Sequence, residues 1–253
     1  MVKIIHKKEI LSTNTWSKEN IFDLDDRTIV VADKQTCGRG RFARKWISEN
    51  SDNIYMSFIL KPVKTNQSFE HLPLANLTQY LAICVLEVLE KYDIKPQLKW
   101  PNDILVNGKK ISGILAELVI KNGQFTGLVL GLGLNLNMSD EDLKQIDKPA
   151  TALNLETGYK VNKDSVLKEI IDKFFENYES FLEKGFLSIR DKYLRHFYLL
   201  NEIVKINFEF NFVEGRIIDV DEKGILILQT LNGEMQEISV GDILWTQNYG
   251  LKV

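Results

Sequence analysis

The chain has 253 residues, of which 44% are hydrophobic and 26% charged, and its formal net charge at pH 7 is −3. This composition is typical of a globular protein with one core, or with one large and one small domain. The mildly acidic balance argues against a broad nucleic-acid-binding face, and no apolar run is long enough to cross a bilayer. The N-terminus lacks the apolar stretch of a signal peptide. We therefore expect a cytoplasmic protein that binds neither DNA nor a membrane.

The first half of the chain mixes helices and strands. A short helix is predicted over residues 14–20, with Ser12 or Thr13 near its N-cap. In a longer helix over residues 70–91, Leu and Val recur at spacings of three and four, so we expect one side of it to be buried. Runs rich in Val and Ile predict strands. They cover residues 28–32, 54–60, 111–120 and 125–132.

The second half continues with helices. An apolar stripe predicts a helix over residues 163–184, capped by Asn162 or Asp164 and ended by Gly185. A further helix is expected over residues 187–197. Because the helices do not alternate regularly with the strands, the pattern favours an α+β fold with a mixed sheet and helices packed against it.

The chain changes character near residues 196–203. Beyond this point short strands are separated by turn signals every 8–12 residues, which is typical of a small β-barrel or sandwich. Asn232 and Gly233 predict a two-residue hairpin turn. We therefore divide the chain into a domain over residues 1–200 and a second domain over residues 201–253.

The sequence offers no metal-ligand pattern. His6, His71 and His196 are far apart, and two cysteines make neither a disulfide framework nor a metal quartet. We interpret Cys84 as a small core residue and Cys37 as a packing residue, because no histidine lies near it in sequence to activate a nucleophile.

The segment TCGRGRFARKW, residues 36–46, concentrates positive charge in a chain that is acidic overall. Its glycines allow the backbone to approach a ligand closely, and its cations favour an anion. These residues are Gly38, Arg39, Gly40, Arg41, Arg44 and Lys45. The pattern predicts a loop that closes over a negatively charged small molecule; the alternative is a solvated surface loop.

The segment LKWPND, residues 98–103, places a lysine beside apolar and aromatic residues. Lys99 next to Trp100, at the end of a strand, is suited to hold a carboxylate or phosphate in a reduced dielectric. Alternatively, its side chain extends from the sheet edge to solvent. Residues 106–110 are typical of a hairpin tip, so we expect Lys109 and Lys110 to be solvated.

The segment GLVLGLGLNLN, residues 127–137, places glycines inside a strand. It is not a dinucleotide fingerprint, because no G-x-G-x-x-G leads into a helix. Gly131 and Gly133 would let a flat ring lie against the strand, and the amide of Asn135 could contact the edge of that ring. A corner of a barrel is the alternative interpretation.

Taken together, these segments resemble biotin protein ligases, of the monofunctional type that lacks an N-terminal DNA-binding domain. The matching motifs are STN at 12–14, GRGR at 38–41, RKW at 44–46, KWPND at 99–103, KISGILAE at 110–117 and GLGLNLN at 131–137. The resemblance implies a mixed sheet like that of class II synthetases, followed by a small SH3-like β-barrel domain.

The resemblance also implies an ATP-dependent reaction in two steps. Biotin and ATP form biotinyl-5′-AMP, and biotin is then transferred to a lysine of a biotin carboxyl carrier domain. Mg²⁺ would be held mainly by the ATP phosphates, and a homodimer would form through the edge of the central sheet. A lipoate-type acyl-adenylate ligase and a non-catalytic sensor of biotin or biotinyl-adenylate are the alternatives.

The roles of individual residues follow from the same resemblance. Lys99 ranks first among the catalytic residues, followed by Arg41 and Arg44, and we expect Arg41 and Lys99 to face one cavity. Biotin would contact Ser12, Thr13, Asn14, Gln35, Gly38, Arg39, Gly40, Arg41, Trp46, Lys99, Gly113 and Leu115. ATP would contact Arg39, Arg41, Arg44, Trp46, Lys99, Asn102, Lys110 and Asn135. The segment 138–150, which contains no tryptophan, stands where relatives fold a second loop over adenine.

Overall fold

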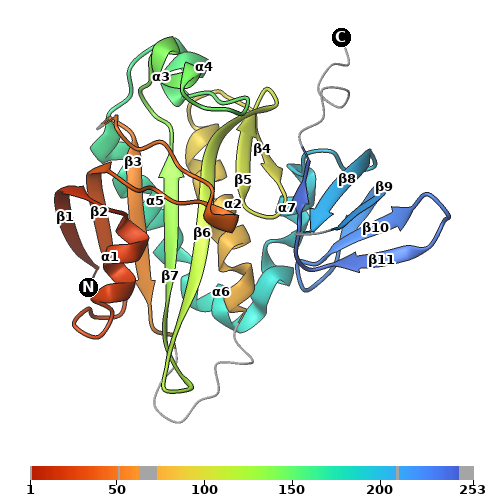
Figure 1. Ribbon diagram of the computed structural model, residues 1–253, viewed down its shortest axis with the longest axis horizontal. Helices are drawn as coiled ribbons and strands as arrows, with labels where there is room; N and C mark the ends of the chain where they lie inside the picture. The colour runs from red at the N-terminus through yellow and green to blue at the C-terminus, as the bar shows by residue number, and fades with distance from the viewer. Residues whose placement is uncertain (1, 51, 63–72, 209–210, 245–253) are drawn as a thin grey trace.

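The computed structural model describes residues 2–50, 52–62, 73–208 and 211–244, whose strands form two sheets (Figure 1). The larger sheet has the strand order β1-β2-β3-β7-β6-β5-β4. Its first pair, β1 and β2, is parallel and the other neighbours are antiparallel, so the sheet is mixed. The strands are β1 (Lys3–Ile10), β2 (Thr28–Gln35), β3 (Ile54–Leu60), β4 (Pro96–Lys99), β5 (Asp103–Val106), β6 (Lys109–Lys121) and β7 (Gln124–Leu134).

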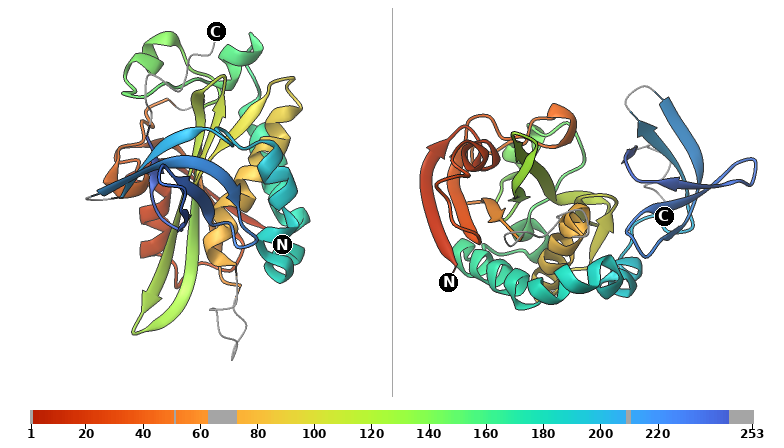
Figure 2. Two further views of the ribbon diagram at one scale, coloured as in Figure 1. Left: turned by 90° about the vertical axis from the view of Figure 1, so that its right-hand side faces the viewer. Right: turned by 90° about the horizontal axis from the view of Figure 1, so that it is seen from below.

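Helices cover both faces of this sheet. The main core lies between the sheet and the helices α2 and α5, whereas a smaller apolar cluster lies on the face that carries α1. Figure 2 shows α2 and α5 to α7 gathered along one side of the larger sheet. The helices are α1 (Thr13–Glu19), α2 (Leu77–Glu90), α3 (Asp140–Lys144), α4 (Leu153–Thr157), α5 (Lys163–Glu176), α6 (Tyr178–Lys184) and α7 (Arg190–Arg195).

Side-chain caps begin two of the helices as predicted. The side chain of Ser12 accepts from the backbone N–H of Thr15 at the start of α1, and Asn162 accepts from the N–H of Ser165 at the start of α5. The helix predicted over 163–184 is divided at Asn177, whose φ of −122° ends α5 and starts α6.

The other predicted helix boundaries differ in part. The helix predicted from residue 70 begins as a 3₁₀ turn at Leu74 and becomes α-helical at Leu77, while residues 70–72 lie outside the described residues. The final helix is shorter than the predicted 187–197, because a 3₁₀ turn over Gly185–Ser188 precedes α7. None of the helices in the described ranges is both long and apolar enough to span a membrane.

Two strands of the larger sheet, β1 and β5, were not predicted, and β4 was expected only as a strand that ends at Lys99. In β1, an edge strand, the isoleucines and the charged residues follow no regular alternation, and no continuous apolar run marks the strand. The strands β4 and β5 have four residues each, which is too short for a periodic signal. They matter for the site because they place Lys99 and Asp103 opposite one another.

The smaller sheet is antiparallel and has the order β11-β10-β9-β8-β12. Asn232 and Gly233 lie between β10 and β11, but the connection has four residues, 231–234, instead of the predicted two. The predicted fold class, a mixed α+β sheet followed by a small SH3-like β module, is confirmed. The strands are β8 (Ile203–Phe208), β9 (Asn211–Val220), β10 (Leu226–Thr230), β11 (Met235–Ile238) and β12 (Asp242–Ile243).

The smaller sheet packs against the larger unit through several polar contacts. Gln79 of α2 donates to the carbonyl of Gly224 over 3.0 Å, and Arg190 of α7 pairs with Asp219 at 2.6 Å. The division into residues 1–200 and 201–253 stays our proposal.

Candidate active site

A cavity of about 680 Å³ lies over the central strands β6 and β7, within the size range of small-molecule sites. Its walls come from the start of α1, the segment 39–47, the segment 145–150 and Asp242 of the smaller sheet. We call residues 38–46 the arginine loop. Six Lys and Arg residues but only three Asp residues line the cavity, so it is positively charged in a chain that is negative overall.

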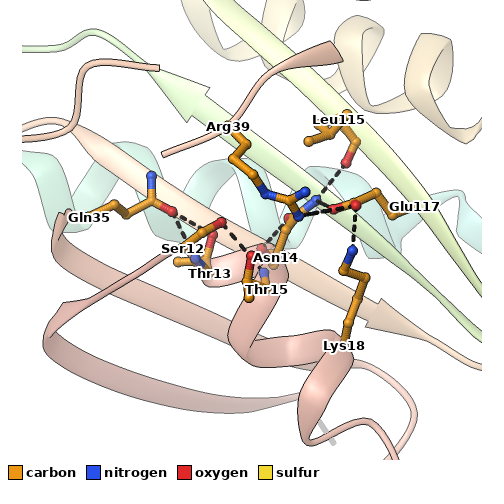
Figure 3. A network of polar contacts seen from close by, with 10 residues as sticks. Ser12, Thr13, Asn14, Thr15, Lys18, Gln35, Arg39, Leu115 and Glu117 are labelled. Carbon is orange, nitrogen blue, oxygen red and sulfur yellow. Dashed lines mark hydrogen bonds and ion pairs between the residues drawn. The ribbon is translucent and has the colours of Figure 1, made fainter. Parts of the chain in front are cut away.

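One end of the cavity contains several neutral polar side chains. The backbone N–H and the hydroxyl of Thr13 both donate to Gln35 Oε1, at 2.8 and 3.2 Å, and Gln35 Nε2 donates to the hydroxyl of Ser48 (Figure 3 shows Gln35 beside α1). Gln35 thereby satisfies a free N–H of the first turn of α1. The cavity is lined at this end by Ser12, Thr13 and Gln35. The resemblance implies that these residues bind a neutral polar group of the ligand.

Asn14 supports the floor of this end. Its Nδ2 donates to the carbonyl of Leu115 and to Glu117, at 3.1 and 2.9 Å, and its Oδ1 accepts from Ser57 Oγ at 2.6 Å. The amide therefore has protein partners for its donor and acceptor groups. A Cβ on Gly131 would lie 2.1 Å from Asn14 Oδ1, so only glycine lets α1 approach β7 this closely.

Trp46 lies across the middle of the cavity on two glycines. A Cβ on Gly133 would lie 2.4 Å from the indole ring, and one on Gly113 would lie 2.9 Å from it. The Lys110 ammonium lies 5.2 Å from the centre of the same ring, within cation–π range. The glycines thus place a flat ring against the strands, and in this structure that ring is Trp46.

The arginine loop is a closed hairpin. The N–H of Trp46 donates to the carbonyl of Gly38 at 2.9 Å, and the N–H of Gly40 donates to the carbonyl of Arg44 at 2.7 Å. Gly38 does not line the cavity; a Cβ there would lie 2.5 Å from the Trp46 carbonyl, so glycine is needed to close the hairpin.

The other end of the cavity is cationic and reaches the smaller sheet. Arg41 and Arg44 both pair with Asp242 of β12, at 3.0 and 2.6 Å, and the Asp242 side chain is only 14% exposed. Lys110 pairs with Asp103 at 2.5 Å. Burial lowers the pKa of Lys148, and the neighbouring charges of Arg44 and Lys110 lower it further. The cluster favours an anion with several charges.

Lys99 is buried beside the cationic end of the cavity. Its residue is 6% exposed, it is not among the residues that line the cavity, and it stands opposite Asp103 in the β4–β5 pair. Burial lowers the pKa of Lys99 to about 8, with the charge of Asp103 opposing the shift. The charges that act on Lys99, those of Asp103, Lys110, Lys148 and Asp242, all belong to residues that line the cavity, so the expectation that Arg41 and Lys99 face one cavity stays a prediction.

Lys110 is a further cation of the cavity wall. Its side chain is 23% exposed and lines the cavity, so the expectation of a solvated lysine is wrong. Two features of the backbone around Lys110 account for its position in the cavity wall. The β5–β6 register shifts after Ile104, and residues 149–151 hydrogen-bond to the backbone of Lys110. Lys109, its neighbour, is exposed as predicted.

The side-chain amide nitrogens of Asn102 and Asn135 each donate a hydrogen bond to a backbone carbonyl. Asn102 Nδ2 donates to the carbonyl of Ile114, while its Oδ1 lies 3.5 Å from Arg41. Asn135 Nδ2 donates to the carbonyl of Thr151. Both residues line the cavity, as do residues 145–150, so the structure identifies the part of segment 138–150 that faces it.

The acidic residues at the site were not predicted, among them Glu117 and Asp242. Glu117 ends the KISGILAE motif and contacts Asn14, Lys18 and Arg39, and Asp242 belongs to the smaller sheet, in which no site residue was predicted. The neighbouring sequence does not identify either residue as part of a site, because the partners of both residues are distant in the chain. Among the described residues, no group of three His, Cys, Asp or Glu is arranged to hold a metal ion.

The fold and the cavity define a two-sheet α+β protein whose site suits a ligand with a neutral polar head and an anionic tail. Residues 7–135 match the model of the Biotin/lipoate A/B protein ligase family, and residues 199–244 match that of the Biotin protein ligase C terminal domain. The chain belongs to the Biotin/lipoate A/B protein ligase family, and the predicted resemblance is confirmed.

Individual relatives agree with this assignment. The biotin protein ligase of Aquifex aeolicus, solved with biotin and ATP, superposes with a TM-score of 0.78 at 33% identity, covering 96% of this chain and 98% of that one. The bifunctional ligase/repressor BirA of Bacillus subtilis is 32% identical over 85% of this chain, which spans 65% of that relative's length. The biotin–[acetyl-CoA-carboxylase] ligase of Paracoccus denitrificans is 27% identical over 86% of this chain and 90% of its own length.

Proposed function

We propose that this chain is a biotin protein ligase, which activates biotin with ATP and transfers it to a lysine of a biotin carboxyl carrier domain. One observation carries the proposal: a single cavity joins a neutral hydrogen-bonding end at Ser12, Thr13 and Gln35 to a cationic end at Arg41, Arg44 and Lys110. Biotin has a neutral ureido ring at one end and a carboxylate at the other. ATP adds the further negative charges that the cationic end can neutralise.

In the first step, a carboxylate oxygen of biotin forms a bond to the α-phosphorus of ATP, and the bond to the bridging oxygen breaks to release pyrophosphate. Both reactants are anions, so their repulsion opposes the reaction. Fixed cations that surround the phosphorus lower this barrier. We assign this role to Arg41, Arg44 and Lys110, which line the cavity.

Lys99 has an indirect role in this proposal. It lies opposite Asp103, and Asp103 pairs with Lys110 at 2.5 Å. We assign Lys99 an electrostatic role. Its positive charge acts on the Asp103 carboxylate, and Asp103 in turn orients the side chain of Lys110. The direct cation at the reacting groups is then Lys110.

In the second step, the ε-amine of the acceptor lysine forms an amide with the acyl carbon, AMP leaves, and the amine releases a proton. Until then the mixed anhydride must be shielded from water. The arginine loop and residues 145–150 lie on the cavity walls and supply that cover. Adenine would lie near Asn135 and Trp46, which supports their assignment to ATP.

Mg²⁺ enters this proposal as part of the substrate MgATP. The carboxylates that line the cationic end, Asp103 and Asp242, are each paired with cations. No three ligating side chains converge within the described ranges. When it is bound to the phosphates, the ion neutralises charge on the leaving pyrophosphate.

The test is to incubate the purified protein with ATP and either biotin or lipoate, and to identify the adenylate by mass spectrometry. We expect biotinyl-AMP, and a biotinylated lysine when a carrier domain is added. Lipoyl-AMP would replace the proposal with a lipoate-type ligase. Tight biotin binding without any adenylate would replace it with a sensor.

We also propose that a homodimer forms through β1. The opposite edge strand, β4, is covered by residues 196–198, since Leu98 exchanges backbone hydrogen bonds with His196 and Tyr198. Sedimentation equilibrium with and without biotin and ATP tests this; a monomer under both conditions would refute it. A cytoplasmic site of action and the absence of DNA binding stay predictions.

A further inference from the structure

Glu117 lies on β6 and joins the arginine loop to α1 (Figure 3). Its carboxylate accepts from Asn14 Nδ2 at 2.9 Å and from Lys18 Nζ at 2.5 Å, and Arg39 Nη2 lies 3.0 and 3.1 Å from its two oxygens. The side chain is 19% exposed and does not line the cavity. Any effect of Glu117 on a ligand therefore passes through its neighbours.

The charge of Glu117 is stabilised where it stands. Burial alone would raise its pKa, but hydrogen bonds from Lys18 and Asn14 and the charges of Lys18 and Arg39 hold the pKa below its ordinary value. The carboxylate is thus ionised at neutral pH. Charge-assisted hydrogen bonds of this kind are stronger than those between neutral groups.

Arg39 is the residue through which this carboxylate reaches the loop. It forms a backbone bridge with Lys45, on the other side of the hairpin. The next residue, Gly40, donates its N–H to the carbonyl of Arg44. Fixing the guanidinium of Arg39 on β6 therefore fixes both sides of the hairpin, and with them Arg41 and Arg44.

We propose that Glu117 is a positioning residue for the arginine loop: it holds Arg39 against β6, so that the loop lies over the biotin end of the cavity and directs Arg41 and Arg44 to the anionic groups. Arg39 also lines the cavity, but its guanidinium pairs with Glu117, and we assign it the role of an anchor. This inference rests on the proposed function for the identity of the ligand, but not for the position of the loop.

The experiment compares Glu117→Gln with Arg39→Met and with the double variant. We expect Glu117→Gln to raise the KM for biotin and the rate of biotinyl-AMP release by about tenfold to a hundredfold, and to lower kcat for adenylate formation because the same loop carries Arg41 and Arg44. Arg39→Met should have the same effect, and the double variant should be no worse than either single one, because each removes the same contact.

Lys18→Met is the matched control. It removes the other cation of Glu117 without touching the loop, so biotinyl-AMP release should stay within about twofold of the parent. A carboxylate that only stabilises the fold would make Lys18→Met and Glu117→Gln alike in release rate. Additive effects of Arg39→Met and Glu117→Gln would show that Arg39 contacts the ligand directly. Either result overturns the inference.

A second measurement separates this inference from the proposed function. Trypsin cleaves after the cations of the loop, and its access depends on how well the loop is held. Without ligands, Glu117→Gln and Arg39→Met should be cleaved between residues 41 and 45 at least about fivefold faster than the parent, and Lys18→Met should not. Equal cleavage of all four proteins would refute the anchor. If the parent makes no biotinyl-AMP, the proposed function fails while the cleavage result still decides the anchor.

Discussion

The guanidinium of Arg41 donates a hydrogen bond to the carboxylate of Asp242 over 3.0 Å, which ties the arginine loop to the smaller sheet. Arg44 pairs with the same carboxylate at 2.6 Å. A side chain of the smaller sheet therefore neutralises the two loop cations that we assign to the phosphates. An incoming anion must compete with Asp242 for them.

Removal of that competitor should strengthen nucleotide binding. Asp242→Asn keeps the size of the side chain and an acceptor oxygen but removes its charge. We expect the Kd for ATP, measured by calorimetry, to fall by roughly tenfold. Asp219→Asn, which removes the partner of Arg190 elsewhere in the smaller sheet, should leave the Kd unchanged. Weaker ATP binding by Asp242→Asn would show that the carboxylate orients the arginines instead of competing for them.

Lys110 should be required for the first chemical step. Because it lines the cavity and Lys109 is exposed, Lys110→Ala and Lys109→Ala form a matched pair. The loss of a charge-assisted contact should slow biotin-dependent pyrophosphate release by about tenfold to a hundredfold in Lys110→Ala only. If Lys110→Ala releases pyrophosphate at the parent rate, another residue supplies the direct cation.

Lys99 should make stability depend on pH in a defined window. Burial lowers its pKa to about 8 in the folded protein, against 10.5 when exposed, so folding disfavours the charged form. Between these values the unfolded chain binds more protons, and the Lys99 contribution to the free energy of unfolding rises with pH. Lys99→Met should therefore be more stable than the parent at pH 7, by on the order of 3 kcal/mol.

That difference should shrink between pH 8 and 10.5, because the parent then loses the cost of burying a charge. Urea unfolding of both proteins across this range measures it, and the comparison cancels other groups that titrate there. A destabilised Lys99→Met protein at pH 7, or a difference independent of pH, would contradict the assignment of a costly buried charge.

Gly131 should tolerate no side chain. An alanine Cβ would lie 2.1 Å from Asn14 Oδ1, so α1 and β7 must separate. We expect Gly131→Ala to lower the free energy of unfolding by about 1–3 kcal/mol and to weaken biotin binding, measured by calorimetry. Asn14→Ala/Gly131→Ala should recover stability relative to Gly131→Ala. Unchanged stability and biotin affinity in Gly131→Ala would show that this close approach is unimportant.

The sequence predicted the parts of the fold that depend on local patterns. Strands buried on both faces, such as β3, appear as continuous apolar runs, and the caps Ser12 and Asn162 precede their helices. The edge strand β1 and the short β4 and β5 carry no such pattern. These strands depend on neighbours supplied by other parts of the chain.

The candidate site, like the fold, was predictable where it depends on a local motif in the sequence. The motifs identified the arginine loop and the glycines beneath Trp46, but not which lysine faces the cavity. That choice depends on a register shift between β5 and β6 and on a segment some 40 residues further along the chain. Glu117 and Asp242 could not be found for a similar reason: each is defined by an ion pair with an arginine that is distant in sequence.

A crystal structure with biotin and ATP bound would locate both ligands in the cavity. We expect the ureido ring of biotin at Ser12, Thr13 and Gln35, and its carboxylate with the α-phosphate between Arg41 and Lys110. Biotin bound in the opposite direction, with its ring at Arg41 and Lys110, or ATP phosphates bound outside this cavity, would contradict this expectation.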